Sequence, residues 1–321
     1  MSVVSYLTQS CQCNSDDLFR LAIDAPRRYK VYSIAKRTSG YRTIAHPSAQ
    51  LKKVQYQLIS AFSQGDSLLT QLAVHSQAMA YKKGIGIKEN AKAHSQNSYL
   101  LKMDFEQFFN SITPELFWRS YHASNPETVL SRTDKKLLEL FLFWAPNKYD
   151  LSRLVLSVGA PSSPLISNFC MYQFDELMYR FCQKKQIVYT RYADDITFST
   201  NVPDVLFTIP KKVDELLKGL FFGAIMINHQ KTVFSSRAHN KHVTGVTITP
   251  KGDLSLGRDR KRYIKHLIHQ FTLGNLTIDD LNHLRGLLSF SQYIEPSFIS
   301  SLQKKYSVSI IDSISRGHYE R

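Results

Sequence analysis

The amino-acid sequence predicts an α+β protein on three observations. Hydrophobic residues make up 43% and aromatic residues 12% of the 321 positions, enough to bury a substantial core. Strand-like and helix-like segments follow one another in an order that favours a mixed sheet with helices on one face. The segment after Lys251 has a helical pattern. We therefore expect one large domain or two to three subdomains.

The first ninety residues are basic and contain a predicted β-hairpin and a helix. Strand patterns at 29–35 and 41–45 flank the turn dipeptide Ser39-Gly40. Residues 47–62 follow as a helix, because apolar residues from Leu51 to Phe62 recur at helical spacing.

The central part alternates strands with helices. Residues 99–105 predict a short strand that runs into a turn and a short helix, and 187–199 predict a second β-hairpin. The turn-rich segment 159–164 precedes a long apolar helix. The remaining predicted elements are helices at 137–144, 165–184 and 211–220 and strands at 224–228 and 242–249.

The last part predicts two helices, 258–271 and 279–293. Ile264, Leu267, Ile268 and Phe271 form an apolar face on the first, opposite Arg258, Lys261, Arg262 and Lys265. The basic face fits either a solvated surface or a clamp on a nucleic-acid duplex.

Composition points to a polyanionic partner. The formal net charge is +15, from 41 Lys and Arg against 26 Asp and Glu, which favours nucleic acid over a merely basic soluble protein. Cys11, Cys13, Cys170 and Cys182 have neither the number nor the spacing of a disulfide framework or a zinc site. No signal peptide or membrane span is apparent, so we expect a cytoplasmic protein without membrane contact.

Two adjacent acids, Asp194 and Asp195, lie inside the strand-like run IVYTRYADDITFS. Successive strand side chains point to opposite faces, so the two can share a site only if the chain turns at 193–195. Asp104, in the pattern LLKMDF, adds a third acid on a neighbouring strand. Three converging carboxylates favour two Mg²⁺ ions and nucleotidyl transfer. A surface turn is the alternative for the acid pair alone.

Five motifs occur together in this chain: Asp104-Phe105 through Phe109, Gly159 through Pro164, Tyr192-Ala193-Asp194-Asp195, Asn228 through Thr232, and Arg42-Thr43-Ile44. Together they resemble a reverse transcriptase over residues 29–288. The resemblance implies a right-hand polymerase fold with fingers, a palm carrying the YADD hairpin, and a helical thumb. It implies catalysis by Asp104, Asp194 and Asp195, with the Phe105 backbone carbonyl as a further metal ligand.

The same resemblance gives four residues a role toward the nucleotide. Lys231 and Arg42 would approach the triphosphate, and Gly159 would adjoin the nucleotide. Phe109, placed against the sugar, would exclude a ribose 2′-OH; the alternative is that Phe108 and Phe109 are both core residues.

Two further motifs resemble those of bacterial retron reverse transcriptases. They are Asn90-Ala91-Lys92-Ala93-His94, the N-A-x-x-H pattern, and Val243-Thr244-Gly245, the V-T-G pattern. We expect Asn90, Ala91, His94, Val243, Thr244 and Gly245 to take part in RNA recognition. A structural histidine is the alternative for His94. The chain departs from the family at Val158, where Gln usually precedes the Gly-x-Pro glycine.

The resemblance implies an RNA-directed DNA polymerase that uses dNTPs to copy its own noncoding RNA into branched multicopy single-stranded DNA (msDNA). Priming would start from a guanosine 2′-OH, and the system would serve in antiphage defence with an effector protein. A group II intron-type enzyme is disfavoured by the N-A-x-x-H and V-T-G motifs. Val158 favours a noncatalytic RNA-binding scaffold, whereas the three retained acids oppose it. A palm-type cyclase would not need the basic hairpin.

The expected domain division has three parts. Residues 1–98 would form N-terminal helices and fingers, 99–250 the palm with an inserted helical segment at about 113–158, and 251–321 the thumb. An RNase H domain would need on the order of 100 further residues. We therefore expect the copied template to be removed by a host RNase H.

Overall fold

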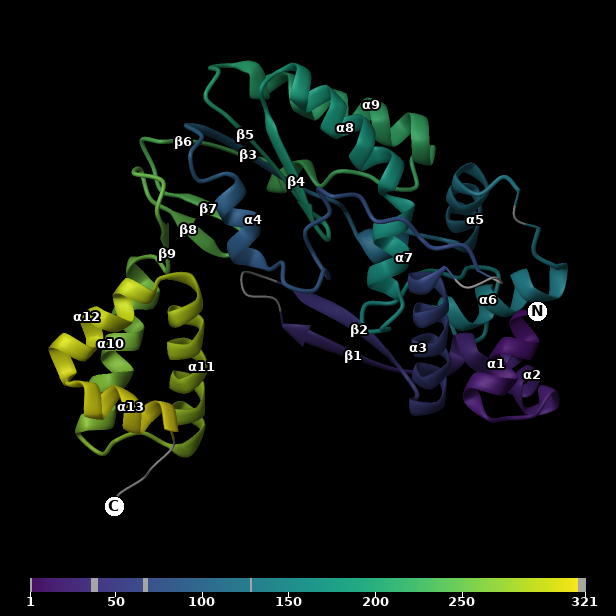
Figure 1. Ribbon diagram of the computed structural model, residues 1–321, viewed down its shortest axis with the longest axis horizontal. Coiled ribbons are helices and arrows are strands. Elements are labelled where there is room, and N and C mark those ends of the chain that lie inside the picture. Colours follow the sequence, from purple (N-terminus) through teal and green to yellow (C-terminus); the bar gives the residue numbers. More distant parts are fainter. Residues whose placement is uncertain (1, 36–39, 66–68, 128, 317–321) are drawn as a thin grey trace.

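The computed structural model describes residues 2–35, 40–65, 69–127 and 129–316. It is an α+β fold, as predicted, and the ribbon runs as an arch with the C-terminal helices on one side and the N-terminal helices on the other (Figure 1). The central sheet has the strand order β4-β5-β3-β6. Its strands are β3 (Tyr99–Asp104), β4 (Val188–Tyr192), β5 (Asp195–Thr200) and β6 (Val233–Ser236).

The pairing of this sheet differs from the expected mixed arrangement. All four strands pair antiparallel, and a parallel pairing occurs at the isolated bridge between Ala78 and Arg191. The strand expected at 224–228 is reduced to one bridge, between Ile227 and Phe105. Asn228 still donates its backbone N–H to the Asp104 carbonyl at 2.8 Å, and the 3-10 turn η4 (His229–Lys231) then bends the chain. The later residues 233–236 become the edge strand β6 instead.

Helices cover both faces of the sheet rather than one. The core face packs on α8 (Tyr172–Lys184) and α9 (Ile209–Phe221). The other face of the β4–β5 hairpin meets α4 (Ile87–Ala93) and His94, which follows it. The alternation of strand side chains separates the two sets of contacts. Sequence patterning missed α4 because it is only two turns long.

The predicted basic hairpin is present as β1 (Tyr29–Ala35) and β2 (Tyr41–Pro47), in register from Tyr29 opposite Pro47 to Ala35 opposite Tyr41. Of its predicted turn, Ser39 lies outside the described residues. Helix α3 (Ala49–Gln64) follows, capped by Ser48, whose hydroxyl accepts from the Leu51 amide.

The strand expected at 242–249 is two strands of a second sheet, ordered β7-β8-β9. Its strands are β7 (Lys241–Val243), β8 (Val246–Ile248) and β9 (Leu254–Ser255). Thr244 and Gly245 form the two-residue turn between β7 and β8, with φ of 46° and 82°. A β-branched residue rarely adopts positive φ, which is why the sequence reads as one strand here.

The remaining helices before the second sheet form the first hydrophobic core together with the central sheet. The long helix expected at 165–184 is broken near Met171 into α7 (Ser163–Cys170) and α8. The helix expected at 137–144 begins earlier, at a Ser131 cap, and ends at Leu142. The others in this part are α1 (Val3–Cys11), α2 (Ser15–Asp24), η1 (Ala25–Arg27), η2 (Phe108–Ser111), α5 (Pro114–Ser124), α6 (Arg132–Leu142) and η3 (Val205–Thr208).

Four helices form the C-terminal part: α10 (Arg258–Thr272), α11 (Ile278–Ile294), α12 (Pro296–Tyr306) and α13 (Val308–Arg316). The apolar face expected on α10 is buried at Ile264, Leu267 and Ile268, and the opposite basic face is largely exposed. These helices share a second core with Val243 and Val246 of the small sheet and with Ala91 of α4.

The cysteines agree with the expectation of no disulfide framework, since all four are free. Within the described ranges, no helix is both long and apolar enough to cross a membrane.

Candidate active site

The catalytic hairpin, residues 188–200, brings the adjacent acids to a tight turn. Tyr192 pairs with Asp195, so the turn consists of Ala193 and Asp194 alone, with Ala193 at φ 57°. The turn expected at 193–195 is therefore present, with Asp195 as the first residue of β5. The turn removes the strict alternation that would send the two carboxylates to opposite faces.

Asp104 lies at the end of β3, directly opposite Asp195 in the pairing of β3 with β5. The next residue, Phe105, donates its backbone N–H to the Asp194 carbonyl at 3.0 Å. The chain thus brings the three predicted acids to neighbouring positions from two adjacent strand ends. Asp104 is buried at 6% exposure, whereas Asp195 reaches solvent.

Burial and mutual repulsion together shift the pKa values of Asp194 and Asp195. Partial burial, followed by the charges of Asp194 and Asp104, raises the pKa of Asp195 to about 7. Burial and then the Asp104 charge raise the pKa of Asp194. The Lys231 ammonium forms an ion pair with the Asp104 carboxylate, and this hydrogen bond raises the pKa of Lys231. The Lys231 ammonium also acts on Asp194 and Asp195 and opposes the rise in their pKa values.

This donor set suits a hard divalent cation. The groups offered are carboxylate oxygens, which Mg²⁺ prefers, and the charges of the neighbouring acids contribute to the raised pKa values of Asp194 and Asp195. Within the described ranges, no three His, Cys, Asp or Glu side chains are yet arranged to enclose a metal ion. In this arrangement Lys231 occupies one Asp104 oxygen, so a divalent ion would compete with the ammonium for that carboxylate.

Arg42 and Gly159 both lie on the β2 side of this site. Arg42 is exposed, and its charge acts on Asp194 to oppose the rise in pKa. Gly159 has φ 131°, and a Cβ there would come within 2.9 Å of the Ala45 carbonyl, so only glycine fits against β2. The neighbouring Val158 contacts β2 through its backbone, since its carbonyl accepts a hydrogen bond from the Ala45 amide at 2.9 Å.

Phe109 is half-buried at the edge of the first core, five residues after Asp104. Its ring lies edge-on to Phe108 at 5.5 Å, and Phe108 is itself fully buried and stacked on Phe105. The two adjacent rings are therefore not equivalent: Phe108 is a core residue, and Phe109 retains an accessible face.

The residues expected to recognise RNA are mostly enclosed by protein. Asn90, Ala91, His94 and Val243 are each 0% exposed. The two motifs nevertheless meet, because the Asn90 amide donates to the Thr244 hydroxyl at 3.3 Å. Gly245 lines a surface cavity of about 690 Å³ together with residues of α10. RNA contact by these motifs stays a prediction, and in this arrangement it would involve the Thr244-Gly245 turn.

Sequence reasoning missed a buried ion pair beneath the turn. The guanidinium of Arg191 and the carboxylate of Asp175, both 0% exposed, join at 2.6 and 2.9 Å. Arg191 also donates to Asn168 at 3.0 Å and to the carbonyl of Ala193, in the turn, at 3.2 Å. The signal was an arginine inside an apolar strand pattern, which requires a buried acid as its partner.

Tyr81 is a second residue near the acids that sequence reasoning did not identify. The residue is 56% exposed, its pKa is raised by partial burial and then by the charge of Asp194, and its backbone has φ 65°. It carries no motif, so no sequence signal indicates its place.

Comparison with known proteins decides the family. Residues 34–248, about two thirds of the chain, match the family described as "Reverse transcriptase (RNA-dependent DNA polymerase)". The chain is 49% identical over 288 residues to the Retron Ec83 reverse transcriptase of Escherichia coli, a match that covers 90% of each protein. This chain belongs to the retron reverse transcriptases.

Other retron enzymes are also similar to this chain. The Retron Ec73 reverse transcriptase of Escherichia coli is 31% identical over 289 residues, 88% of each chain. The Retron Mx65 reverse transcriptase of Myxococcus xanthus is 26% identical over 87% of this chain and 64% of its own. Among solved structures, apo telomerase from Candida tropicalis has a TM-score of 0.48 at 13% identity, with 89% of this chain and 61% of that chain covered.

Membership in the retron reverse transcriptases establishes the right-hand polymerase fold and an RNA-directed DNA polymerase. All predicted catalytic and nucleotide-binding residues, from Arg42 to Lys231, lie inside the matched region 34–248. The palm sheet of this retron reverse transcriptase carries Asp104, Asp194 and Asp195 at one end.

Proposed function

We propose that this polymerase copies its own noncoding RNA into branched msDNA, starting from a guanosine 2′-OH of that RNA, and that it acts in antiphage defence with an effector protein. The observation that carries the proposal is the convergence of Asp104, Asp194 and Asp195 at one end of a polymerase palm. The similarity to the Retron Ec83 reverse transcriptase, which extends along most of both chains, supports the retron part.

The proposed chemistry depends on the three aspartates and on the Phe105 carbonyl as holders of two Mg²⁺ ions. When bound, the ions would activate the attacking hydroxyl and neutralise the departing pyrophosphate. Asp195 has a pKa of about 7, so it must lose a proton to take part in metal binding.

The chain's own residues orient the nucleotide in this proposal. Arg42 carries a positive charge toward Asp194 from the fingers strand, and Lys231 carries another from the Asp104 side. These charges flank the acids and suit the triphosphate of a dNTP. Gly159 has no side chain, which lets this segment lie close against β2. The accessible face of Phe109 suits a deoxyribose.

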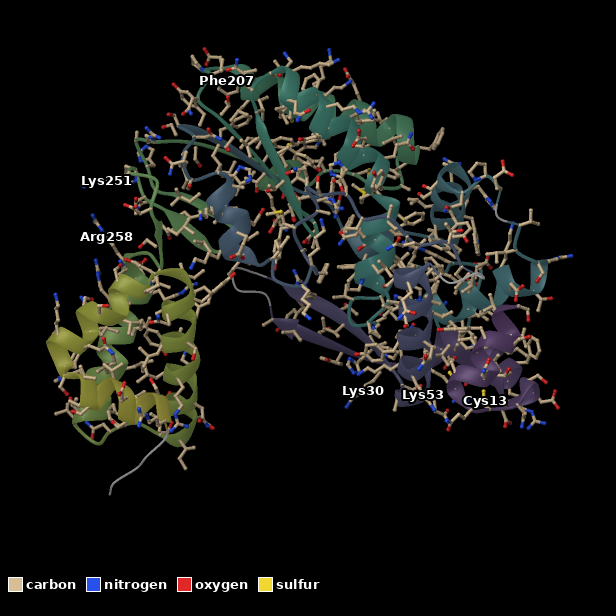
Figure 2. The ribbon with its side chains drawn as sticks, viewed as in Figure 1. Cys13, Lys30, Lys53, Phe207, Lys251 and Arg258 are labelled. Carbon is tan, nitrogen blue, oxygen red and sulfur yellow. The ribbon has the colours of Figure 1, made fainter. Side chains whose placement is uncertain are left out.

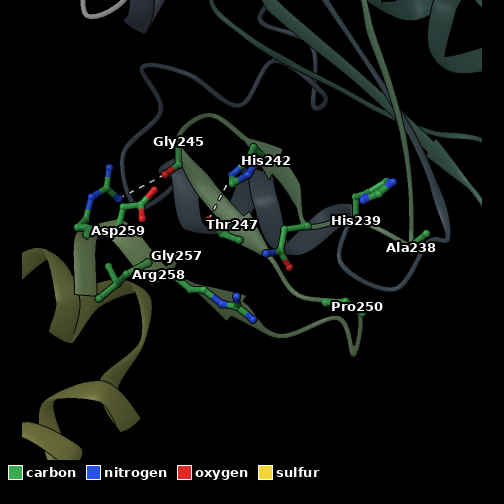
Figure 3. Close-up of a pocket in the computed structure, with 12 residues that line it drawn as sticks. Ala238, His239, His242, Gly245, Thr247, Pro250, Gly257, Arg258 and Asp259 are labelled. Atoms are coloured by element: carbon green, nitrogen blue, oxygen red, sulfur yellow. Dashed lines mark hydrogen bonds between the residues drawn. The ribbon is translucent and has the colours of Figure 1, made fainter. Parts of the chain in front are cut away.

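We further propose that the cognate RNA docks at the cavity beside the Thr244-Gly245 turn (Figure 3). Arg258 and Arg260 line it, and Figure 2 shows Lys251 and Arg258 on this outer side, away from the β1–β2 hairpin. Cationic side chains around a polar cavity suit the phosphate backbone of a folded RNA.

We propose a cytoplasmic enzyme whose template is removed by host RNase H, with fingers, palm and thumb divided at 1–98, 99–250 and 251–321. The second core supports a close association of the last two parts, because Val243 and Val246 pack with the α10 residues.

The test is to express the chain with its neighbouring genomic DNA, purify it, and analyse the bound nucleic acid. We expect single-stranded DNA joined to RNA that a 2′-5′ debranching enzyme releases, and none with Asp194→Asn. Equal DNA from wild type and variant, or none from either, would contradict catalysis by this site. DNA that lacks a debranchable link would contradict the priming step alone.

A further inference from the structure

A chain of hydrogen bonds runs behind the catalytic hairpin through the motif residues that have no part in the proposed chemistry. Its members are side chains of Asn201, Asn97, Ser199, His94, Thr190, Asn90 and Thr244. His94 occupies the middle and is fully buried. This series of hydrogen bonds starts just after the end of β5 and ends in the turn between β7 and β8.

The donors of this network all point in one direction. The Asn97 amide donates to the Ser199 hydroxyl at 2.7 Å, which leaves the Ser199 proton for His94 Nδ1, also at 2.7 Å. His94 therefore carries its proton on Nε2 and donates to the Thr190 hydroxyl at 2.8 Å. Burial lowers the pKa of His94 to about 3, so the ring stays neutral.

The second half of the network continues in the same sense. The Thr190 hydroxyl donates to the Asn90 side-chain oxygen at 2.6 Å, and the Asn90 amide donates to the Thr244 hydroxyl at 3.3 Å. Buried hydrogen bonds that are aligned head to tail polarise one another and fix a single arrangement of the groups involved.

The position of the network relates it to catalysis. Thr190 lies on β4 and Ser199 on β5, so His94 joins both strands of the hairpin whose turn holds Asp194. At the other end, Gly245 follows Thr244, lines the surface cavity, and accepts from the Arg260 guanidinium of α10 at 3.4 Å (Figure 3).

We propose that Asn90 and His94 are positioning residues, which hold the catalytic hairpin in a fixed place relative to the Thr244-Gly245 turn and to nucleic acid bound beside it. The inference rests on the proposed role of the hairpin aspartates. Asn90 and His94 act through Thr190, Ser199 and Thr244, because their own side chains have no exposed surface.

The test uses hydroxyl deletions of minimal volume change, Thr190→Val and Thr244→Val, with Thr190→Ser and Thr244→Ser as the conservative variants. Thr200→Val is the matched control, because Thr200 is a buried threonine of β5 whose hydroxyl donates to the Gln186 carbonyl outside the network. The full chain extends a DNA primer on a generic RNA template, and kcat, the KM for dNTP, duplex affinity and Tm are measured.

We expect each valine variant to lower kcat by roughly tenfold to a hundredfold, the scale of effects from misplaced catalytic groups. Duplex affinity should change less than about twofold, each serine variant should recover most of the rate, and Thr200→Val should keep the wild-type kcat. The variant that carries both Thr190→Val and Thr244→Val should lose less kcat than the product of the two single fold reductions, because both changes interrupt one network.

Several results would overturn the inference. Weaker duplex binding with an unchanged kcat would assign these residues to RNA contact. A lower Tm with an unchanged kcat of the folded enzyme would make the network structural only. Equal losses in Thr200→Val would show that any buried threonine change at the hairpin has this effect. If Thr190→Val is as active as the wild type while Asp194→Asn is inactive, the role of the network is rejected and the catalytic site is not. If Asp194→Asn is active, the proposed catalytic site itself is rejected.

Discussion

Asp195 and Asp104 form a directly opposed pair in the sheet, yet their surroundings differ. Asp104 is buried and has the Lys231 ammonium beside it, whereas Asp195 reaches solvent and lacks an ion pair among the described residues. Like charges directly opposite each other on paired strands are destabilising. The site therefore holds unfavourable electrostatic energy that bound cations would relieve.

The raised pKa of Asp195, caused by partial burial and then by the charges of Asp194 and Asp104, predicts a pH dependence of stability in the absence of divalent metal. The folded pKa of Asp195, about 7, lies above its ordinary value of 3.8, so the folded state holds the proton more tightly. The resulting stabilisation is present below about pH 4 and is lost as the pH rises through 7. Near pH 8, the free energy of unfolding of Asp195→Asn should thus be about 1 kcal/mol higher than that of the wild type. The difference is modest because solvent screens the side chain.

The measurement is urea unfolding of both proteins with chelator present, at about pH 5 and about pH 8. The difference in the free energy of unfolding should shrink at the lower pH, where wild-type Asp195 is protonated. A difference that does not vary with pH would show that Asp195 does not titrate in this range.

Phe109 gives a prediction on sugar selection. Because its ring is half-buried and lies five residues after Asp104, Phe109→Ala should admit ribonucleotides and raise the rNTP to dNTP ratio of kcat/KM by about tenfold or more. Phe108→Leu is the matched control, because Phe108 is buried and stacked on Phe105. That variant should lower stability and leave discrimination unchanged, and unchanged discrimination in Phe109→Ala would place Phe109 in the core as well.

At the scale of elements, the catalytic hairpin is held from both faces of the sheet. Tyr189 and Arg191 alternate with Thr190 along β4, so the first two meet Asp175 of α8 and the third meets His94. The hairpin itself was predictable, because a two-residue turn with an acid separates two apolar runs. The ion pair with Asp175 was not, because the partner of a buried arginine depends on how α8 packs.

The Asp175–Arg191 pair predicts separate effects on stability and activity. Asp175→Asn leaves the Arg191 charge buried without a counterion and should reduce the free energy of unfolding by about 3 to 5 kcal/mol. Replacing both residues, with Asp175→Leu and Arg191→Met, should restore much of the stability. The double variant still lacks the hydrogen bond to the Ala193 carbonyl, so its polymerase rate should stay low.

Urea unfolding and primer extension on the three proteins check this prediction. A double variant with both stability and activity restored would mean that Arg191 serves only packing and does not hold the turn.

At the scale of the whole molecule, sequence patterns were most informative where a motif and an element coincide. The acids, Arg42 and Lys231 follow from motifs placed on predicted strands or turns, and the structure brings them together. The edge strand β6 and the small sheet were misread, because exposed strands and a threonine at positive φ lack the expected patterns. The family motif N-A-x-x-H was found, but its burial depends on long-range packing that no local pattern encodes.

The net charge of +15 leads to a final prediction, on where the cognate RNA binds. If it docks at the cavity of Figure 3, which Arg258 lines and Lys251 adjoins after Pro250, Lys251→Gln with Arg258→Gln should weaken cognate RNA binding. The magnitude of the salt slope should fall by about 1 to 2, one for each phosphate that is no longer neutralised. Extension on a generic primer–template should keep its rate. Lys30→Gln with Lys53→Gln removes the same charge from the opposite side of the arch in Figure 2 and is the matched control. Filter binding at several salt concentrations separates the alternatives, because equal weakening by both pairs would mean that the total charge, rather than this surface, attracts the RNA.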